Sequence, residues 1–265
     1  MDPRTERELY QILAPEERQA ADRALREEVR RRRIAAQGRL RILLGRYLKV
    51  EPAGLRFRKG PRGKPYLEGE PAPLQFNLAH SGGLALAAVH PELEVGVDVE
   101  RRRRGIATEA IAGKFFSPGE AAWLRELEEA EREEAFYRIW TAKEAFVKAH
   151  GAGLSFGLGE FTVSVAGAYR MVEIRGGTEE ARRWTLWRLE PGPGYVGAAA
   201  VRARGLELRC YDWPEGWDPP RSHRVQASGG GGCAAKMEKR ERDLCNTTSR
   251  TRGKTRGFPP TRKCR

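Results

Sequence analysis

The sequence has no apolar run that approaches the roughly 20 residues of a membrane-spanning helix. Its first residues, MDPRTERELYQIL, also lack the apolar centre of a secretory signal. These two absences predict a protein without a membrane span, located in the cytoplasm. Hydrophobic residues still make up 40% of the 265-residue chain, which is enough for the core of one large domain or two small ones.

Cysteine is scarce: the chain has four, and only Cys210 precedes residue 221. No pair has the C-x-x-C spacing of a zinc site, so a zinc-binding module is not predicted. Because a single thiol cannot form a bridge within the body of the protein, we expect Cys210 to be reduced and packed in the interior.

Acidic residues are few only near the C-terminus. Of the formal net charge of +13, residues 221–265 carry +10 and residues 1–220 carry +3. The high isoelectric point therefore gives little support to nucleic-acid binding by the folded body. After Pro219-Pro220 the chain turns to SGGGG and a Lys-, Arg- and Thr-rich run, which predicts a disordered basic tail over residues 218–265. The alternatives for this tail are a nucleic-acid or membrane-surface arm, and a cloning or frame artefact, since its composition has nothing in common with the body.

The hydrophobic pattern predicts an α/β (α+β) protein. Helical spacing covers residues 15–49 and 106–150, and Ser117-Pro118-Gly119-Glu120 has the form of a capping box. Short apolar runs bounded by Gly, Pro and Asn predict strands at 55–57, 74–78, 84–89, 95–99, 161–165, 170–174, 184–189, 195–201 and 206–211. The order of helices, strands, helices, strands predicts two similar helix-on-sheet halves, residues 1–105 and 106–217.

The first chemical signal is VGVDVE at residues 95–100. Strand alternation places its valines on one face, and Gly96, Asp98 and Glu100 on the other, with the two acidic Cα atoms about 7 Å apart. Two like charges on one face repel, so a cation is expected between them, and carboxylate oxygens suit Mg²⁺. The alternative is a solvated strand end paired with the arginines at 101–104.

The second signal is WTAKEAFVK at residues 140–148. On a helix, Glu144 and Lys148 are one turn apart, while Lys143 projects to one side. The other side chains of this helix are mostly apolar, and a charged stripe among them needs a partner or a ligand. An ordinary surface ion pair is the alternative.

The third signal is FNLAHSGG at residues 76–83, where an apolar strand runs into His80, Ser81 and two glycines. Such a turn can present an imidazole and backbone N–H groups to an anion, although, for this segment taken alone, a plain turn between strands with His80 bonded to backbone is favoured. Upstream, GPRGKP at 60–65 is a loop that presents two cations.

Together these segments resemble the motifs of one family, the 4′-phosphopantetheinyl transferases of the Sfp type. The matching segments are GKPYL at 63–67, FNLAHSG at 76–82, VGVDVE at 95–100, FFSPGE at 115–120 and WTAKEAFVKAHGAGL at 140–154. The resemblance covers residues from about 10 to 213. It implies a pseudo-dimer of two α/β halves with coenzyme A in the cleft between them. It also implies an enzyme that transfers 4′-phosphopantetheine from coenzyme A to a serine of an apo acyl or peptidyl carrier protein, releasing adenosine 3′,5′-bisphosphate.

The resemblance also implies roles for individual residues. Asp98, Glu100 and Glu144 are expected to hold Mg²⁺, or Mn²⁺ in its place. Glu144 is also the candidate general base, directly or through water, and Lys148 is expected to neutralise the pyrophosphate and protonate the leaving group. His80 joins these as a candidate catalytic residue and, with Lys64, as a ligand of the coenzyme phosphates. Three further candidate contacts to the coenzyme are Asn77, Ser81 and Lys143.

The chain departs from the family pattern at two positions. Ala79 stands where the family usually has Ser, and Gln37 stands where it commonly has Arg. Both positions resemble contacts to the 3′-phosphate of the coenzyme, so we expect this chain to discriminate less than usual against dephospho-coenzyme A. Arg33 and Arg41, about one helical turn on either side of residue 37, are the candidate compensating cations.

Two other classes of function compete with this interpretation. A different metal-dependent phosphoryl or nucleotidyl transferase would use a nucleoside triphosphate, and the chain has no G-x-x-x-x-G-K-[ST] sequence. A non-enzymatic basic protein would bind nucleic acid through the tail alone. Because the two halves already form a cleft, we expect a monomer. The sequence does not specify which carrier protein is modified.

Overall fold

The computed structural model describes residues 1–69, 74–103, 105, 108–213 and 233–239. Its helices are α1 Pro3–Gln11, α2 Pro15–Asp22, α3 Glu27–Leu48, α4 Thr108–Phe115, α5 Pro118–Glu126 and α6 Glu129–His150. Its strands are β1 Phe57–Lys59, β2 Pro65–Leu67, β3 Gln75–Ser81, β4 Leu84–His90, β5 Val95–Arg101, β6 Phe161–Ser164, β7 Arg170–Ile174, β8 Thr185–Leu189, β9 Tyr195–Val201, β10 Leu206–Asp212 and β11 Cys233–Lys239. Within these ranges no helix is long and apolar enough to cross a membrane.

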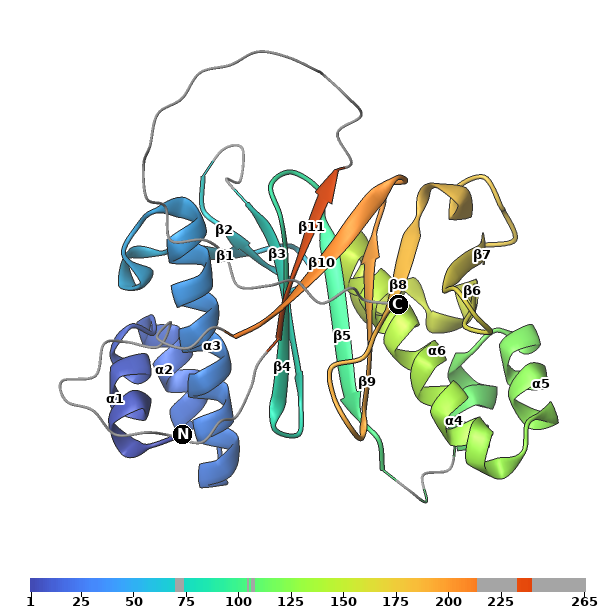
Figure 1. Ribbon diagram of the computed structural model, residues 1–265, viewed down its shortest axis with the longest axis horizontal. Coiled ribbons are helices and arrows are strands. Elements are labelled where there is room, and N and C mark those ends of the chain that lie inside the picture. Colours follow the sequence, from blue (N-terminus) through green and yellow to red (C-terminus); the bar gives the residue numbers. More distant parts are fainter. Residues whose placement is uncertain (70–73, 104, 106–107, 214–232, 240–265) are drawn as a thin grey trace, which may run out of the picture.

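Two long helices flank the central strands. Helices α3 and α6 each have 22 residues, and each ends at a left-handed residue, Lys49 and Gly151 respectively. Figure 1 shows α1–α3 on one side of the strands and α4–α6 on the other. Leucines of α3 pack on residues of β3 and β4, while α6 packs on β5 and β9. The predicted α/β architecture of two helix-on-sheet halves is confirmed.

The strands form two larger sheets and two hairpins. One sheet has the order β10-β11-β4-β3, the other the order β5-β9-β8, and β1-β2 and β6-β7 are separate pairs. Strand β5 precedes the predicted boundary at residue 105, yet it pairs antiparallel with β9 of the second half, with Asp98 opposite Ala198. The acidic motif therefore lies where the two halves meet.

The valine face of β5 enters a core between the halves, as the alternation predicts. Val95, Val97 and Val99 are at most 1% exposed. They pack with small residues of the neighbouring strands, among them Ala79, Ala88, Ala199 and Val201. Because these side chains are short, the two sheets approach closely and leave the opposite face of β5 to α6.

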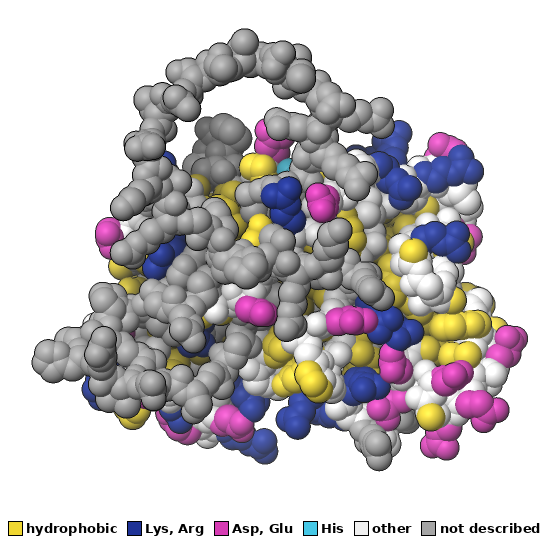
Figure 2. All heavy atoms as spheres, in the orientation of Figure 1, with side chains coloured by type: hydrophobic (Ala, Val, Ile, Leu, Met, Phe, Trp, Pro, Cys, Tyr) yellow, Lys and Arg dark blue, Asp and Glu magenta, His cyan; other side chains and the backbone are white. Residues whose placement is uncertain are grey.

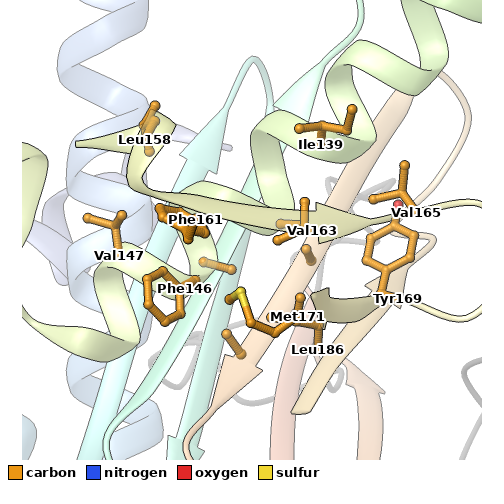
Figure 3. Close-up of a cluster of buried hydrophobic side chains, with 14 of the residues drawn as sticks. Ile139, Phe146, Val147, Leu158, Phe161, Val163, Val165, Tyr169, Met171 and Leu186 are labelled. Atoms are coloured by element: carbon orange, nitrogen blue, oxygen red, sulfur yellow. The ribbon is translucent and has the colours of Figure 1, made fainter. Parts of the chain in front are cut away.

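A second core fixes α6 from the other side. Phe146 is completely buried, with its ring centre 4.4 Å from that of Phe161 and 4.6 Å from that of Trp184. Figure 3 shows Phe146 and Val147 of α6 lying near Phe161, Val163 and Met171 of the β6–β7 hairpin. Burying such a side chain contributes about 2–3 kcal/mol, so this packing holds the helix firmly against the strands.

Local predictions have mixed outcomes. Pro15 opens a helix, and the Ser117–Glu120 capping box forms as predicted. The helical spacing over residues 15–49 predicts one helix with Leu25 and Val29 on its apolar face, and this is wrong, because the chain leaves the helix between α2 and α3 and both side chains are exposed. Helix α1 was not expected from the pattern; the Asp2 carboxylate caps it by accepting from two backbone N–H groups.

The C-terminal segment also differs from expectation where it is described. Residues 233–239 of the predicted disordered tail form strand β11, antiparallel to β10 and parallel to β4. The rest of residues 218–265 lies outside the described part of the chain. Cys210 on β10 is 8% exposed and packs in the core between the halves as expected, but it is disulfide-bonded, so the expectation of a reduced thiol is wrong.

Candidate active site

A single glycine lets α6 lie directly on the acidic face of β5. A Cβ atom at Gly96 would lie 2.0 Å from the carbonyl oxygen of Ala145 and 2.4 Å from the backbone nitrogen of Ala149. No side chain fits in that space, so only glycine allows this approach. The approach brings Glu144 and Lys148 of α6 beside Asp98 of β5.

Asp98 and Lys148 form the centre of the site. The Lys148 ammonium donates to Asp98 Oδ1 at 2.6 Å. Asp98 is 5% exposed, and its second oxygen, Oδ2, is buried without a hydrogen-bond partner among the described residues. Burial raises the pKa of Asp98 to about 7, Lys148 opposes that rise, and Glu100 and Glu144 add to it. The carboxylate thus lies among more negative charge than one ammonium balances.

Glu144 and Glu100 complete the acidic group. Burial raises the pKa of Glu144; Lys148 works against this shift, and the negative charge of Glu100 adds to it. Glu100 accepts a hydrogen bond from Ser81 Oγ at 2.7 Å, and the same Oγ accepts from the backbone N–H of Arg101 at 3.1 Å. Ser81 therefore fixes one of the three carboxylates from the end of β3.

The donor set fits a hard divalent cation, although the described side chains are not arranged as a ready metal centre. In the described ranges, no three His, Cys, Asp or Glu side chains are grouped so as to hold an ion. Lys148 supplies the positive charge at Asp98 instead. The unpartnered oxygen of Asp98, close to two further carboxylates, is nevertheless the oxygen-rich environment that Mg²⁺ uses in proteins.

His80 and Arg33 border the same group from the first half. His80 is exposed at the end of β3. Partial desolvation lowers its pKa, the positive charges of Arg33 and Lys148 lower it further, and Glu100 opposes them. His80 therefore interacts electrostatically both with the acidic group and with the cations Arg33 and Lys148.

The comparisons with known proteins identify the family. Residues 94–200 match the model of the 4′-phosphopantetheinyl transferase superfamily. The chain is 37% identical over 208 residues to 4′-phosphopantetheinyl transferase HetI of Nostoc sp., which covers 78% of this chain and 85% of that protein. This chain belongs to the 4′-phosphopantetheinyl transferase superfamily.

Other relatives share shorter regions with this transferase. A putative 4′-phosphopantetheinyl transferase of Synechocystis sp. is 40% identical over 150 residues, 56% of this chain and 61% of that protein. The transferase Sfp of Bacillus subtilis is 31% identical over 152 residues, 57% of this chain and 66% of that protein. The resemblance stated from the sequence motifs is therefore confirmed.

Not every predicted site residue of the transferase reaches the cleft. Lys143 is completely buried in the second half, where its ammonium forms an ion pair with Glu120 at 2.7 Å and donates to the carbonyls of Leu158 and Phe161. These three acceptors use all three of its N–H donors. The structure therefore places Lys143 in the core and not at the coenzyme.

Arg41 and Asn77 are also used elsewhere. Arg41 is 1% exposed, and it bonds the Glu17 carboxylate at 2.7 Å and the carbonyls of Pro52 and Leu55. Asn77 Oδ1 accepts from the backbone N–H of Val97 at 2.8 Å, a bond that ties β3 to β5 across the two sheets. Of the two candidate compensating cations, Arg33 is the one whose charge acts on His80, while its Nη1 donates to the carbonyl oxygen of Ala20.

Lys64 lies near the site but faces away from open solvent. Its side chain is 9% exposed, and its ammonium contacts the Glu94 carboxylate and the carbonyls of Val95 and Lys148. Ala79, where the family usually has serine, is 5% exposed within the core between the halves.

One structural contributor was missed by the sequence reasoning. Tyr195 of β9 accepts from the backbone N–H of Gly83 at 3.0 Å and so holds the turn that follows His80 and Ser81. No local pattern signals this contact, because the two residues are 112 positions apart in the chain.

Proposed function

We propose that this transferase moves 4′-phosphopantetheine from coenzyme A to a serine of an apo carrier protein, in a magnesium-dependent reaction in the cleft between its two halves, at the residues of β5 and α6 described above. The observation that carries the proposal is Asp98. It is a buried carboxylate with one oxygen on Lys148 and the other unpartnered, beside Glu100 and Glu144. A buried charge with incomplete hydrogen bonding destabilises the folded protein, and a ligand that binds to the free oxygen offsets this destabilisation.

The metal ligands in this proposal are Asp98, Glu100 and Glu144. Bound Mg²⁺ would neutralise the pyrophosphate of the coenzyme and the charge that develops during phosphoryl transfer. Protein side chains supply the remaining positive charge and the proton transfers. Because three carboxylates share the site, their mutual repulsion favours binding of any added positive charge.

The proton transfers are assigned to Glu144 and Lys148. The serine oxygen forms a bond to the β-phosphorus of coenzyme A, and the bond from that phosphorus to the bridging oxygen of adenosine 3′,5′-bisphosphate breaks. Glu144 accepts the serine proton, directly or through water. Lys148 stabilises the negative charge on the departing bisphosphate and is the candidate donor of a proton to it.

The coenzyme phosphates are assigned to His80 and Arg33. Arg33 takes the part of the missing arginine at residue 37, since Arg41 is committed to Glu17. We expect Arg33→Gln to raise KM for coenzyme A by about tenfold while KM for dephospho-coenzyme A changes by less than about twofold. Restoring Gln37→Arg and Ala79→Ser together should increase discrimination against dephospho-coenzyme A; unchanged discrimination would contradict this assignment.

We expect the carrier protein to dock on a surface other than the acidic end of the second half. Glu126, Glu128, Glu129 and Glu131 are exposed there. In Figure 2, acidic side chains gather at the lower right of the molecule, over α5 and the start of α6. A carrier with an acidic helix beside its serine would be repelled from this surface. One chain supplies every group named here, so a monomer is sufficient for the reaction.

The direct test is mass spectrometry of apo acyl and apo peptidyl carrier proteins incubated with the transferase, coenzyme A and Mg²⁺. The proposal predicts a mass gain of one phosphopantetheine group that is lost with EDTA and with Asp98→Ala. Transfer that persists in EDTA would contradict the metal assignment. A folded protein that binds coenzyme A but modifies none of several carriers would contradict the proposed acceptor class.

A further inference from the structure

Two cations of the loop at residues 60–65 contact the end of α6. Arg62 Nη1 donates to the carbonyl oxygen of Ala152 at 2.6 Å, and Lys64 Nζ donates to the carbonyl oxygen of Lys148 at 2.8 Å. The last four carbonyls of a helix have no partner within the helix, and Lys148 supplies one of them. A positive charge at a helix C-terminus is favourable as well. The loop from the first half therefore caps the catalytic helix of the second half.

Lys64 joins this helix end to the start of β5. Its ammonium also donates to the carbonyl oxygen of Val95 at 3.1 Å and pairs with the Glu94 carboxylate. All three N–H donors are thus used on the protein itself. Burial lowers the pKa of Lys64, and the Glu94 carboxylate opposes that shift. Lys64 bridges the two elements that carry Lys148 and Asp98.

The loop at residues 60–65 also lies at ordinary van der Waals distance from the turn that follows α6. Gly151 and Gly153, which follow α6, have φ angles of 72° and 61°, a conformation that favours glycine. A Cβ at Gly153 would lie 3.5 Å from the Cβ of Arg62, and one at Gly151 would lie 3.5 Å from the hydroxyl of Tyr66. The loop is therefore seated on the turn that ends the helix.

We propose that Arg62 and Lys64 are positioning residues that hold the last turn of α6 at a fixed height above β5. Lys64 binds the main chain of Lys148, whose side chain reaches Asp98 at 2.6 Å. The clamp therefore sets where the Lys148 ammonium and the Glu144 carboxylate lie relative to Asp98. The expected effect of the clamp on catalysis rests on the proposed transferase reaction, whereas its expected effect on the end of α6 does not.

The proposal differs from direct binding of a coenzyme phosphate by Lys64, and the two can be separated. The variants are Lys64→Met and Arg62→Met, with Lys59→Met as the matched control, because Lys59 is an exposed lysine on the neighbouring strand β1. One readout is amide hydrogen exchange at residues 148–152. The other is kcat and KM with coenzyme A and with dephospho-coenzyme A, measured on the full-length chain.

The clamp predicts that Lys64→Met speeds exchange in the last turn of α6 by about tenfold or more and lowers kcat by about tenfold. The ratio of the two KM values should change by less than about twofold. Arg62→Met, which loses one contact and keeps Lys64, should act in the same direction and more weakly. Lys59→Met should leave exchange and kinetics unchanged.

A rise in KM for coenzyme A alone, with exchange at residues 148–152 unchanged, would overturn the clamp and make Lys64 a phosphate ligand. If Lys64→Met does not fold, Arg62→Met still decides, since unchanged exchange at residues 148–152 in that variant would also overturn the proposal. If the wild-type chain modifies no carrier, the proposed function fails, but the exchange measurement still tests the clamp.

Discussion

Helix α6 carries two lysines, five residues apart, that each pair with a buried carboxylate, and the two pairs lie in different environments. Lys143 meets Glu120 at 2.7 Å inside the second half, and Lys148 meets Asp98 at 2.6 Å between the halves. The side chains of the first pair are 0% and 3% exposed, whereas the side chains of Lys148 and Asp98 are 29% and 7% exposed. Similar distances thus accompany unequal contact with solvent.

The pairs differ most in whether their hydrogen bonds are complete. Glu120 also accepts from the backbone N–H groups of Ser117 and Val163, so both of its oxygens are used. Asp98 leaves Oδ2 without a partner in the described part of the chain. A satisfied buried network stabilises one conformation, while an unsatisfied one retains capacity to bind a ligand. We infer that the first pair serves the fold and the second serves the reaction.

The largest expected effect comes from Asp98→Asn. The amide keeps the shape of the side chain but removes the charge that holds Lys148 and the proposed cation. We expect kcat/KM to fall by about 10³-fold, with cooperative unfolding retained. Carrier modification followed by mass spectrometry and urea unfolding measure the two quantities. A loss of activity below about tenfold would contradict the assignment of Asp98.

The next largest effect is on stability, from Lys143→Met. This substitution leaves Glu120 as a buried carboxylate without its cation, and breaking a buried pair in this way costs about 3–5 kcal/mol. The kcat/KM of the folded fraction should stay within about threefold of wild type. Lys148→Met is the matched control, with the opposite pattern. Equal destabilisation by the two substitutions would remove the distinction between the pairs.

A smaller effect is expected from Asn77→Ala. This change leaves the buried N–H of Val97 without an acceptor, which costs about 1–3 kcal/mol. Because Val97 precedes Asp98 on β5, we also expect a modest loss of kcat, and urea unfolding together with steady-state kinetics checks both. Unchanged stability would show that the bond across the two sheets contributes nothing.

The smallest effect is a pH dependence of the metal-free protein. Burial raises the pKa of Asp98 from 3.8 to about 7. Between these values the folded chain holds a proton that the unfolded chain has released, so wild-type stability falls as pH rises. Asp98→Asn has no such group. In EDTA, the difference in free energy of unfolding should therefore move in favour of Asp98→Asn from pH 5 to 8. A constant difference would place Asp98 in a more solvated environment.

The sequence predicts those features of the site that depend on a local pattern of residues. Alternation places the valines of β5 in the core and Asp98 on the other face, and Gly96 marks the space that α6 fills. Helical spacing places Glu144 and Lys148 together. These predictions hold because the period of a strand or helix determines which side chains share a face.

The difference between Lys143 and Lys148 could not be predicted in this way. The acceptors of Lys143 come from α5 and from the segment around residues 158–161, which only tertiary packing brings to it. The same applies to Arg41 and Asn77, whose partners lie 11–24 and 20 residues away respectively. Whether a polar residue of a motif stabilises the fold or takes part in the reaction therefore depends on partners that are distant in the sequence.

The central claim is that the pair between the halves, and not the pair in the core, holds the cation. Electron paramagnetic resonance of Mn²⁺ in the presence of coenzyme A measures this directly on wild type, Asp98→Asn and Glu120→Gln. The account predicts one bound Mn²⁺ per chain, with affinity reduced by about tenfold or more in Asp98→Asn and unchanged in folded Glu120→Gln. Equal Mn²⁺ affinity in wild type and Asp98→Asn would contradict it.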